Sequence, residues 1–240
     1  MINSGTSSAA HTALTVNTAK AVYIFDVDRT VIKKTSAEYF LRTALRGKYI
    51  RFSQIKGLLA DLIKYKLARA NNDFIENAVK KLCGLNNSDI EKISQICFEE
   101  KIKPNIFTEA SSLINELQKN GEKVIFATSS FDFIIRPLEK YFCIEGSLAS
   151  RLEYKDGVTT GNLDGKSLFG QRKKQAAMEW MSRNCIEAKD AVFYSDSYTD
   201  IPLLECCGYP VAVNPDRILK QKAIKSGWKI LKFKKVLGKN

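Results

Sequence analysis

A five-residue apolar run, Ala21 to Phe25, ends abruptly at Asp26. A short, partly β-branched run of this kind is typical of a strand buried on both faces of a parallel sheet. Beyond residue 120, similar runs alternate with segments of helical periodicity. Strands separated by helices predict an α/β fold with a Rossmann-like, doubly wound parallel sheet. Further strands are expected at 123–127, 191–194, 211–213 and 228–231, helices at 131–141, 171–183 and 201–206, and a hairpin at 148–160 that turns at Lys155-Asp156-Gly157.

Helical periodicity fills residues 35 to about 120, directly after the first strand. Thr35 or Ser36 can cap the first of these helices, which ends at Arg46. The others are expected over the apolar stripe 52–67, over 73–82, after a capping box at Ser88 and Glu91, and from Pro104 to near Gly121. The sequence therefore predicts a disordered tail at 1–20, an α/β core at 21–33 and 106–240, and a helical cap inserted at 34–105.

Composition argues against several kinds of site. His11 is the sole histidine, so a Ser-His-Asp triad, a Cys-His protease and a His-built zinc site are not expected. The six cysteines show no C-x-x-C spacing, which indicates reduced packing residues. No apolar stretch is long enough for a membrane span, and the first 20 residues lack a signal-peptide pattern. We expect a cytoplasmic protein whose catalysis uses carboxylates, lysines and hydroxyls.

The net charge of +12 is unevenly distributed. Residues 33–105 carry 15 basic and 8 acidic side chains, residues 106–214 carry 12 and 15, and residues 215–240 carry 9 and 1. Basic segments of this kind favour an anionic substrate or a peripheral membrane contact through the C-terminal lysines, although a solvated basic surface explains them equally well. Nucleic acid is not expected as a partner.

Polar residues follow directly after three of the predicted strands, where ligands of open α/β sheets bind. The first strand leads into Asp26-Val27-Asp28-Arg29-Thr30, the second into Thr128-Ser129-Ser130, and the third into Ser195-Asp196-Ser197 with Asp200 beyond. Carboxylates that converge at one edge of a sheet repel each other unless a cation lies among them. Oxygen ligands of this kind favour Mg²⁺.

The runs FDVDRT, ATSS and YSDSYTD, together with a lysine on a later helix, resemble the four motifs of the haloacid dehalogenase (HAD) superfamily, whose members are mostly phosphatases. The helical insertion after the first motif and the run GYPVAVNPDRILKQKAIKSGWKIL are similar to its subfamily IB, the phosphoserine phosphatase-like enzymes. The resemblance covers roughly residues 21–231. It implies a phosphatase with a mobile cap that closes over the site and selects the substrate.

The resemblance also implies a role for each motif residue. Asp26 would be the nucleophile that forms an aspartyl-phosphate, and Asp28 would be the general acid and base. Thr128 would bind a phosphoryl oxygen, assisted by the amides of Ser129 and Ser130 at the start of the next helix. Lys173, with Lys174 as the alternative, would be the motif lysine. Arg29 is a further candidate for substrate binding, and the metal-site residues are Asp26, Asp28 through its carbonyl, Asp196, and Asp200 behind them.

Two departures from the phosphoserine phosphatases concern the substrate. Those enzymes carry a glutamate nine residues after the nucleophile, where this chain has Thr35, and a small residue where it has Arg29. Glu38, one helical turn further on, is a weaker substitute for the missing acid. We therefore expect a Mg²⁺-dependent phosphatase for a small phosphomonoester other than phosphoserine. The alternatives are a phosphatase for lipid head-group phosphates at a membrane surface and a non-catalytic protein of the same fold that binds nucleic acid or membrane.

Overall fold

The computed structural model describes residues 21–47, 76–77 and 79–238, and its centre is a parallel β-sheet of six strands. In the order in which they pair, the strands are β3 (Ser147–Ser150), β2 (Lys123–Phe131), β1 (Val22–Phe25), β6 (Ala191–Ser195), β7 (Tyr209–Val213) and β8 (Lys229–Leu231). Every neighbouring pair is parallel. The expected α/β fold with a parallel sheet is confirmed.

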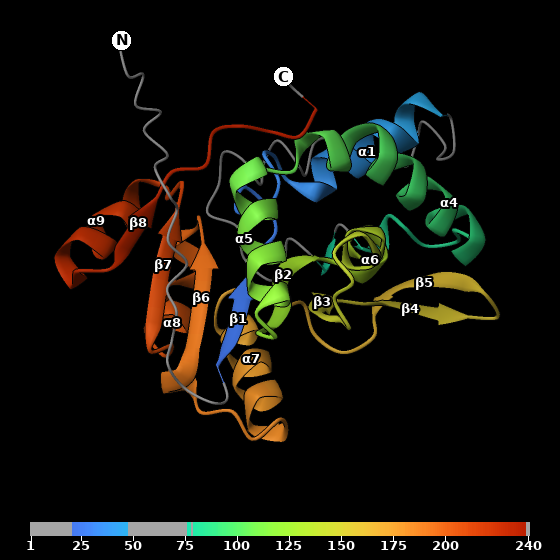
Figure 1. Cartoon of the computed structure of the whole chain (residues 1–240). Helices are drawn as coiled ribbons and strands as arrows, with labels where there is room; N and C mark the ends of the chain where they lie inside the picture. Colours follow the sequence, from blue (N-terminus) through green and yellow to red (C-terminus); the bar gives the residue numbers. More distant parts are fainter. Residues whose placement is uncertain (1–20, 48–75, 78, 239–240) are drawn as a thin grey trace, which may run out of the picture.

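Helices cover both faces of this sheet (Figure 1). Successive side chains of a strand point to opposite faces, so Tyr23 and Phe25 of β1 lie in one core and Val22 and Ile24 lie in the other. The first core is shared with α5 (Thr108–Lys119) and α6 (Asp132–Tyr141), and the second with α7 (Gln171–Arg183), α8 (Ile201–Leu204) and α9 (Arg217–Ser226). A sheet buried on both faces explains why its strands are continuous apolar runs.

The described part of the insertion is helical and packs on the first of these cores. Helix α1 (Ser36–Arg46) is capped by Thr35, whose hydroxyl accepts a hydrogen bond from the Glu38 amide. Helix α4 (Asn87–Cys97) continues through a π-helical turn, η1 (Phe98–Ile102), and a 3₁₀ turn, η2 (Lys103–Asn105). Both α1 and α4 contact α6. The helix predicted over 52–67 lies outside the described residues, and of the helix predicted over 73–82 residues 76–77 and 79–82 are described.

Two local predictions are wrong. The capping box at Ser88 and Glu91 does not form, because the N-cap of α4 is Asn86, two residues before Ser88, and the Asn87 side chain donates to Glu91 instead. The predicted hairpin over 148–160 divides into two structures. Its first residues belong to β3 in the main sheet, and the hairpin proper pairs β4 (Leu152–Lys155) with β5 (Val158–Leu163) around the expected turn at Asp156-Gly157.

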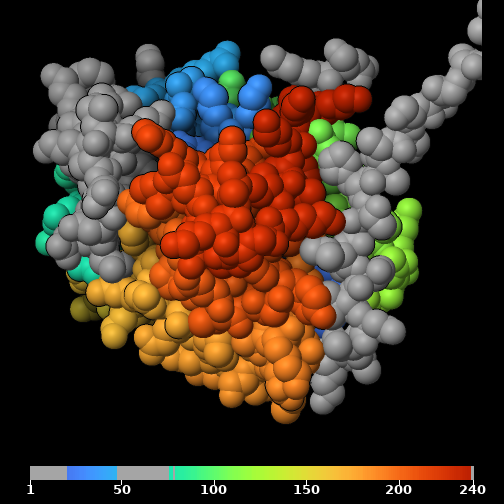
Figure 2. All heavy atoms as spheres, turned by 90° about the vertical axis from the view of Figure 1, so that its left-hand side faces the viewer, coloured from blue at the N-terminus to red at the C-terminus, as the bar shows by residue number. Residues whose placement is uncertain are grey.

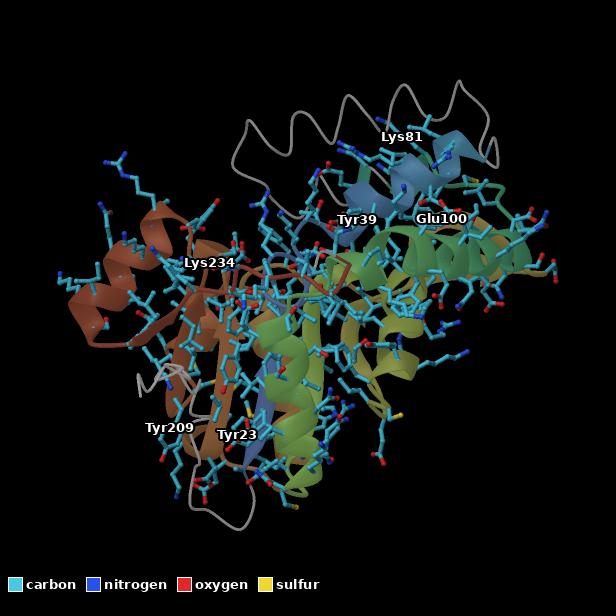
Figure 3. All side chains as sticks on the ribbon, turned by 45° about the horizontal axis from the view of Figure 1, so that its top comes forward. Tyr23, Tyr39, Lys81, Glu100, Tyr209 and Lys234 are labelled. Atoms are coloured by element: carbon cyan, nitrogen blue, oxygen red, sulfur yellow. The ribbon has the colours of Figure 1, made fainter. Side chains whose placement is uncertain are left out.

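The segment that follows β8, residues 232–238, crosses from the sheet to the base of the insertion, and we call it the C-terminal strap (Figure 1; Lys234 is labelled in Figure 3). Its backbone pairs with the link that returns from the insertion: Thr108 donates to the Lys235 carbonyl at 3.0 Å, Leu237 to Ile106 at 3.0 Å, and Gly238 to Pro104 at 2.9 Å. That link in turn pairs with the outgoing one, because Lys33 donates to Asn105 and Phe107 to Val31, both at 2.9 Å. In the space-filling view of Figure 2, the strap and α9 belong to one continuous red surface.

Within the residues that the structure describes, no helix is long and apolar enough to cross a membrane.

We predict that Gly208→Ala destabilises the protein by disturbing the start of β7. Gly208 precedes β7, and a Cβ atom added there would lie 1.8 Å from the carbonyl oxygen of Lys189, so the main chain would have to shift. The free energy of unfolding, measured by urea denaturation, should fall by about 2–3 kcal/mol. Gly146→Ala is the matched control, because a Cβ atom added there would meet nothing within 4 Å, and its unfolding curve should match that of the parent. Equal stability of the two variants would contradict the prediction.

Candidate active site

The polar residues at the carboxyl ends of β2, β1 and β6 meet at one end of the sheet because these three strands are parallel neighbours. They line a cavity of about 70 Å³. Every predicted site residue except Ser130 lines this cavity, together with Thr35, Phe169, Ser197 and Thr199. A larger hollow of about 560 Å³ lies at the opposite end of β7, beside Tyr209 and Trp228, but no group of carboxylates and hydroxyls converges among its described lining residues. The smaller cavity is therefore the candidate active site.

A buried lysine joins two of the acidic groups. Nζ of Lys173 donates to Oδ1 of Asp26 at 2.9 Å and to Oδ2 of Asp200 at 2.8 Å. The hydroxyl of Ser195 donates to the same Asp200 oxygen at 2.7 Å. Lys173 lies in the first turn of α7 and is only 2% exposed, whereas Lys174 is half-buried and outside the cavity. Of the two adjacent lysines, Lys173 contacts the acidic residues of the cavity and Lys174 does not line it.

Three carboxyls of the cavity, those of Asp26, Asp28 and Asp196, hold their protons more strongly than exposed carboxyls do. Burial raises the pKa of Asp26 to about 7; the Lys173 ammonium opposes this effect, and Asp200 and Asp28 add to it by repulsion. Burial followed by repulsion from Asp26 raises the pKa of Asp196 well above its ordinary value. Burial disfavours the charged form of Lys173, but the carboxylates of Asp200 and Asp26 outweigh it and raise the pKa of this lysine. If these carboxyls were all ionised, a single ammonium would not balance their charge, and this is why burial and mutual repulsion favour their protonated forms when no further cation is present.

The start of the insertion holds the second acid of the first motif. The amide of Ser36, the first residue of α1, donates to Oδ1 of Asp28 at 2.8 Å. The Ser36 hydroxyl donates to the hydroxyl of Ser130 at 2.6 Å. Burial raises the pKa of Asp28, and the hydrogen bonds from Ser36 oppose this rise. Ser36 thus ties the insertion to the loop after β1 and to β2.

The structure corrects the expectation for Ser129 and Ser130. Both lie inside β2, which continues to Phe131, so their amides do not form the start of a helix; α6 begins at Asp132. The amide of Ser130 donates to Oγ1 of Thr128 at 3.1 Å, and its side chain is bound to Ser36. Of this motif, Thr128 and Ser129 line the cavity and Ser130 does not.

Asp216 is a site-supporting residue that the sequence analysis does not identify. Its Oδ2 accepts from the Tyr198 amide at 2.7 Å and its Oδ1 from the Leu219 amide at 2.8 Å, so it caps α9 while it holds the loop after β6. Its own amide donates to the Asp196 carbonyl at 2.8 Å. The sequence does carry one signal for it, because an aspartate directly before a helical segment is a common N-cap residue.

The donor set fits the expected Mg²⁺. Across the residues that the structure describes, no group of three or more His, Cys, Asp or Glu side chains surrounds one point, but the expected set needs only the carboxylates of Asp26 and Asp196 with the Asp28 carbonyl. These are the hard oxygen ligands that Mg²⁺ prefers, and their excess negative charge is what a dication would offset. Asp200 is already bound to Lys173 and Ser195, and its Oδ1 is buried without a hydrogen-bond partner among the described residues.

Comparison with known proteins identifies the family. The family profile of the haloacid dehalogenase-like hydrolases matches residues 23–205. The chain therefore belongs to the haloacid dehalogenase-like hydrolases. Within this family it is phosphoserine phosphatase-like, and the expected class of enzyme, a phosphatase, is confirmed.

Three curated relatives illustrate the similarity. The "Inhibition of morphological differentiation protein" of Streptomyces azureus is 32% identical over 87% of this chain and 77% of its own length. "Phosphoserine phosphatase SerB1" of Mycobacterium tuberculosis is 28% identical over 89% of this chain and 71% of its own. A "Histidinol-phosphatase" of Neisseria meningitidis is 28% identical over 90% of this chain and all of its own. A solved structure from Bordetella pertussis, of unknown function, has the same fold with a TM-score of 0.81 at 23% identity, over 89% of this chain and 99% of that one.

We predict that Lys173→Met destabilises the protein and that Lys174→Met does not. Removing the Lys173 ammonium leaves Asp26 and Asp200 buried without their common cation, which should lower the free energy of unfolding by roughly 3 kcal/mol at pH 8. Lys174 lies next to it in the chain but outside the cavity. Urea denaturation of both variants checks the prediction, and a larger loss in Lys174→Met would contradict it.

We further predict that the metal-free protein, kept in EDTA, becomes less stable as the pH rises from 5 to 8. Between the unfolded pKa of an aspartate, about 4, and the folded value of about 7 for Asp26, the folded protein binds a proton that the unfolded chain has released. The stability that this proton contributes is present at low pH and is lost as the pH rises, by up to about 1.4 kcal/mol per pH unit and group. Urea midpoints in EDTA should fall across this range, Mg²⁺ should restore them at pH 8, and Asp26→Asn should reduce the slope. Midpoints that rise with pH would contradict the assignment.

Proposed function

We propose that this protein is a Mg²⁺-dependent phosphatase that hydrolyses a small phosphomonoester through an aspartyl-phosphate on Asp26. The observation that carries the proposal is the Lys173–Asp26 contact at the carboxyl end of β1, in a cavity that also contains Asp28 and Thr128. This contact fixes the orientation of the Asp26 carboxylate. The nucleophile, an acid and an oxyanion-binding hydroxyl are therefore grouped within one small space.

In the first step, a carboxylate oxygen of Asp26 attacks phosphorus, and the bond from phosphorus to the ester oxygen breaks. The leaving oxygen takes a proton from Asp28. Burial raises the pKa of Asp28, which favours the protonated form that this role needs. The Ser36 amide donates to Oδ1 of Asp28 and thereby orients the carboxyl group. The products of this step are an aspartyl-phosphate on Asp26, a free alcohol and an ionised Asp28.

In the second step, Asp28 removes a proton from water as the water oxygen attacks phosphorus. The bond between phosphorus and Asp26 breaks, which restores the Asp26 carboxylate and releases inorganic phosphate. Thr128 and the Lys173 ammonium bind phosphoryl oxygens in both steps and offset the charge that develops on them. Bound to Asp26, Asp196 and the Asp28 carbonyl, Mg²⁺ would offset further phosphoryl charge.

The cavity does not support phosphoserine as the preferred substrate. Thr35 lines the cavity with an uncharged side chain. Glu38 is not a substitute acid, because it forms ion pairs with Arg42 at 2.8 Å and with Lys34 at 3.5 Å and does not line the cavity. The relatives point to no single substrate, since two that are 28% identical carry the names of different ones.

A lipid phosphate is a second candidate substrate. The outer face of α9 carries two exposed isoleucines, Ile218 and Ile224, among the basic residues Arg217, Lys220 and Lys225. A basic helix with exposed apolar residues is suited to an anionic membrane surface. The non-catalytic alternative has less support, because none of the acidic residues needed for catalysis is missing.

We predict that Asp26→Asn abolishes the hydrolysis of p-nitrophenyl phosphate. The amide is a poor nucleophile, so turnover with Mg²⁺ should fall by at least about a thousandfold, and the parent should lose most of its activity in EDTA. Asp156→Asn makes the same chemical change at the exposed turn of the β4–β5 hairpin and should leave turnover unchanged. Release of p-nitrophenol measures all of these rates. Equal turnover in Asp26→Asn and the parent would refute the proposed nucleophile.

A further inference from the structure

Arg29 is a cation of the cavity that the proposed chemistry does not use. It follows Asp28 directly, lines the cavity and is exposed to solvent. Among the described residues it forms no ion pair, in contrast to Lys173, which two carboxylates hold and which is almost completely buried. As far as the structure describes it, the cavity therefore has a buried, paired cation at its floor and an exposed, unpaired cation at its rim.

The backbone conformation of Arg29 also indicates a functional role for this residue. Its φ angle is +61°, in the left-handed region that side chains other than glycine adopt at a cost. A non-glycine residue in this conformation persists where the surroundings over-determine it, and such residues cluster at functional sites. The side chain of Arg29 is long, charged and part of the cavity lining.

Two carboxylates of the cavity attract Arg29, those of Asp196 and Asp28, but neither lies within ion-pair distance of it, and the proposed function assigns Asp196 to the metal. Asp26 and Asp200 are bound to Lys173, and the Asp28 carboxylate accepts the Ser36 amide. Glu38 on α1 is balanced by Lys34 and Arg42. Thr35, the described residue of the insertion that lines the cavity, is uncharged. A group of the substrate that extends past the phosphoryl position would thus meet a positive rim.

We propose that Arg29 is a specificity-determining residue that binds a second anionic group, a carboxylate or a further phosphate, on the leaving group of the substrate. This inference rests on the proposed phosphatase function and narrows it to phosphomonoesters whose leaving group is negatively charged. The transferring phosphoryl group occupies the floor beside Asp26 and Lys173, and the second anion lies toward the rim. A leaving group that carries an ammonium would be repelled by Arg29.

Three substrates with leaving groups of similar size separate charge from shape. 2-Phosphoglycolate carries a carboxylate, ethyl phosphate carries no second charge, and phosphoethanolamine carries an ammonium. The measurement is kcat/KM for each with Mg²⁺, in the parent and in Arg29→Gln, Arg29→Lys and Arg29→Gly. Arg183→Gln removes the same charge from an exposed position at the far end of α7 and is the matched control.

In the parent, we expect 2-phosphoglycolate to be preferred over ethyl phosphate by about fivefold, and ethyl phosphate over phosphoethanolamine by a similar factor, because the contact is partly solvated. In Arg29→Gln and Arg29→Gly these ratios should fall toward one, and in Arg29→Lys part of the preference should remain. Salt at about 1 M should weaken the preference of the parent. The Arg183→Gln ratios should equal those of the parent. 2-Phosphoglycerate and fructose 1,6-bisphosphate then distinguish a carboxylate from a phosphate as the second anion.

The possible failures are distinguishable. If the parent hydrolyses none of these substrates, the proposed function fails. If it hydrolyses all of them without regard to charge, or prefers phosphoethanolamine, the inference about Arg29 fails and the proposed function stands. If Arg29→Gln lowers kcat/KM for the three substrates by one common factor, Arg29 contacts the transferring phosphoryl group and the inference is likewise overturned. Arg29→Gly relieves the left-handed backbone, so a melting temperature equal to or above that of the parent shows that the loss of preference is not a loss of folding.

Discussion

The ammonium of Lys173 is the contact on which the site and its surroundings depend. An unpaired charge at 2% exposure costs several kcal/mol, so this lysine is tolerated only because Asp26 and Asp200 both reach it. These two carboxylates lie beyond β1 and β6, and the lysine lies at the start of α7. Three segments that are distant in the sequence must therefore assemble correctly before any of their charges is satisfied. The geometry of the candidate site therefore depends on the correct packing of α7 against β1 and β6.

Much of the fold could be predicted from the sequence, because a sheet buried on both faces leaves a strong apolar pattern. The strands β1, β6 and β7 and the helices α1, α5 and α7 are such cases. Strand β3 is less visible, since Ser147–Ser150 is half polar and lies at the edge of the sheet. Helix α9 buries only Leu219 and Ala223, and its many basic residues hide the helical periodicity. The polar end of β2 is extended because β3 pairs with it across a register shift, which no local pattern records.

The candidate site was predictable in its residue types and less so in its partners. Motif order pointed to the acids, but Lys173 and Lys174 are adjacent in the sequence and only their position on α7 separates the buried side chain from the half-buried one. The contacts of Ser36, Ser195 and Asp216 join segments that only the tertiary structure brings together. Short polar side chains of this kind are common at caps and turns, so nothing in a single sequence marks the few that support a site.

The C-terminal strap couples the last described residues to the base of the insertion. The outgoing and returning links form one hydrogen-bonded group with residues 235–238, through contacts on both sides of Phe107. A rotation of α1 and α4 away from the sheet must either break the bonds of Thr108, Leu237 and Gly238 or carry the strap with it. Any peptide or tag joined beyond Gly238 is thus mechanically connected to the pivot about which the helices would swing, although it is distant in sequence from every residue that lines the cavity.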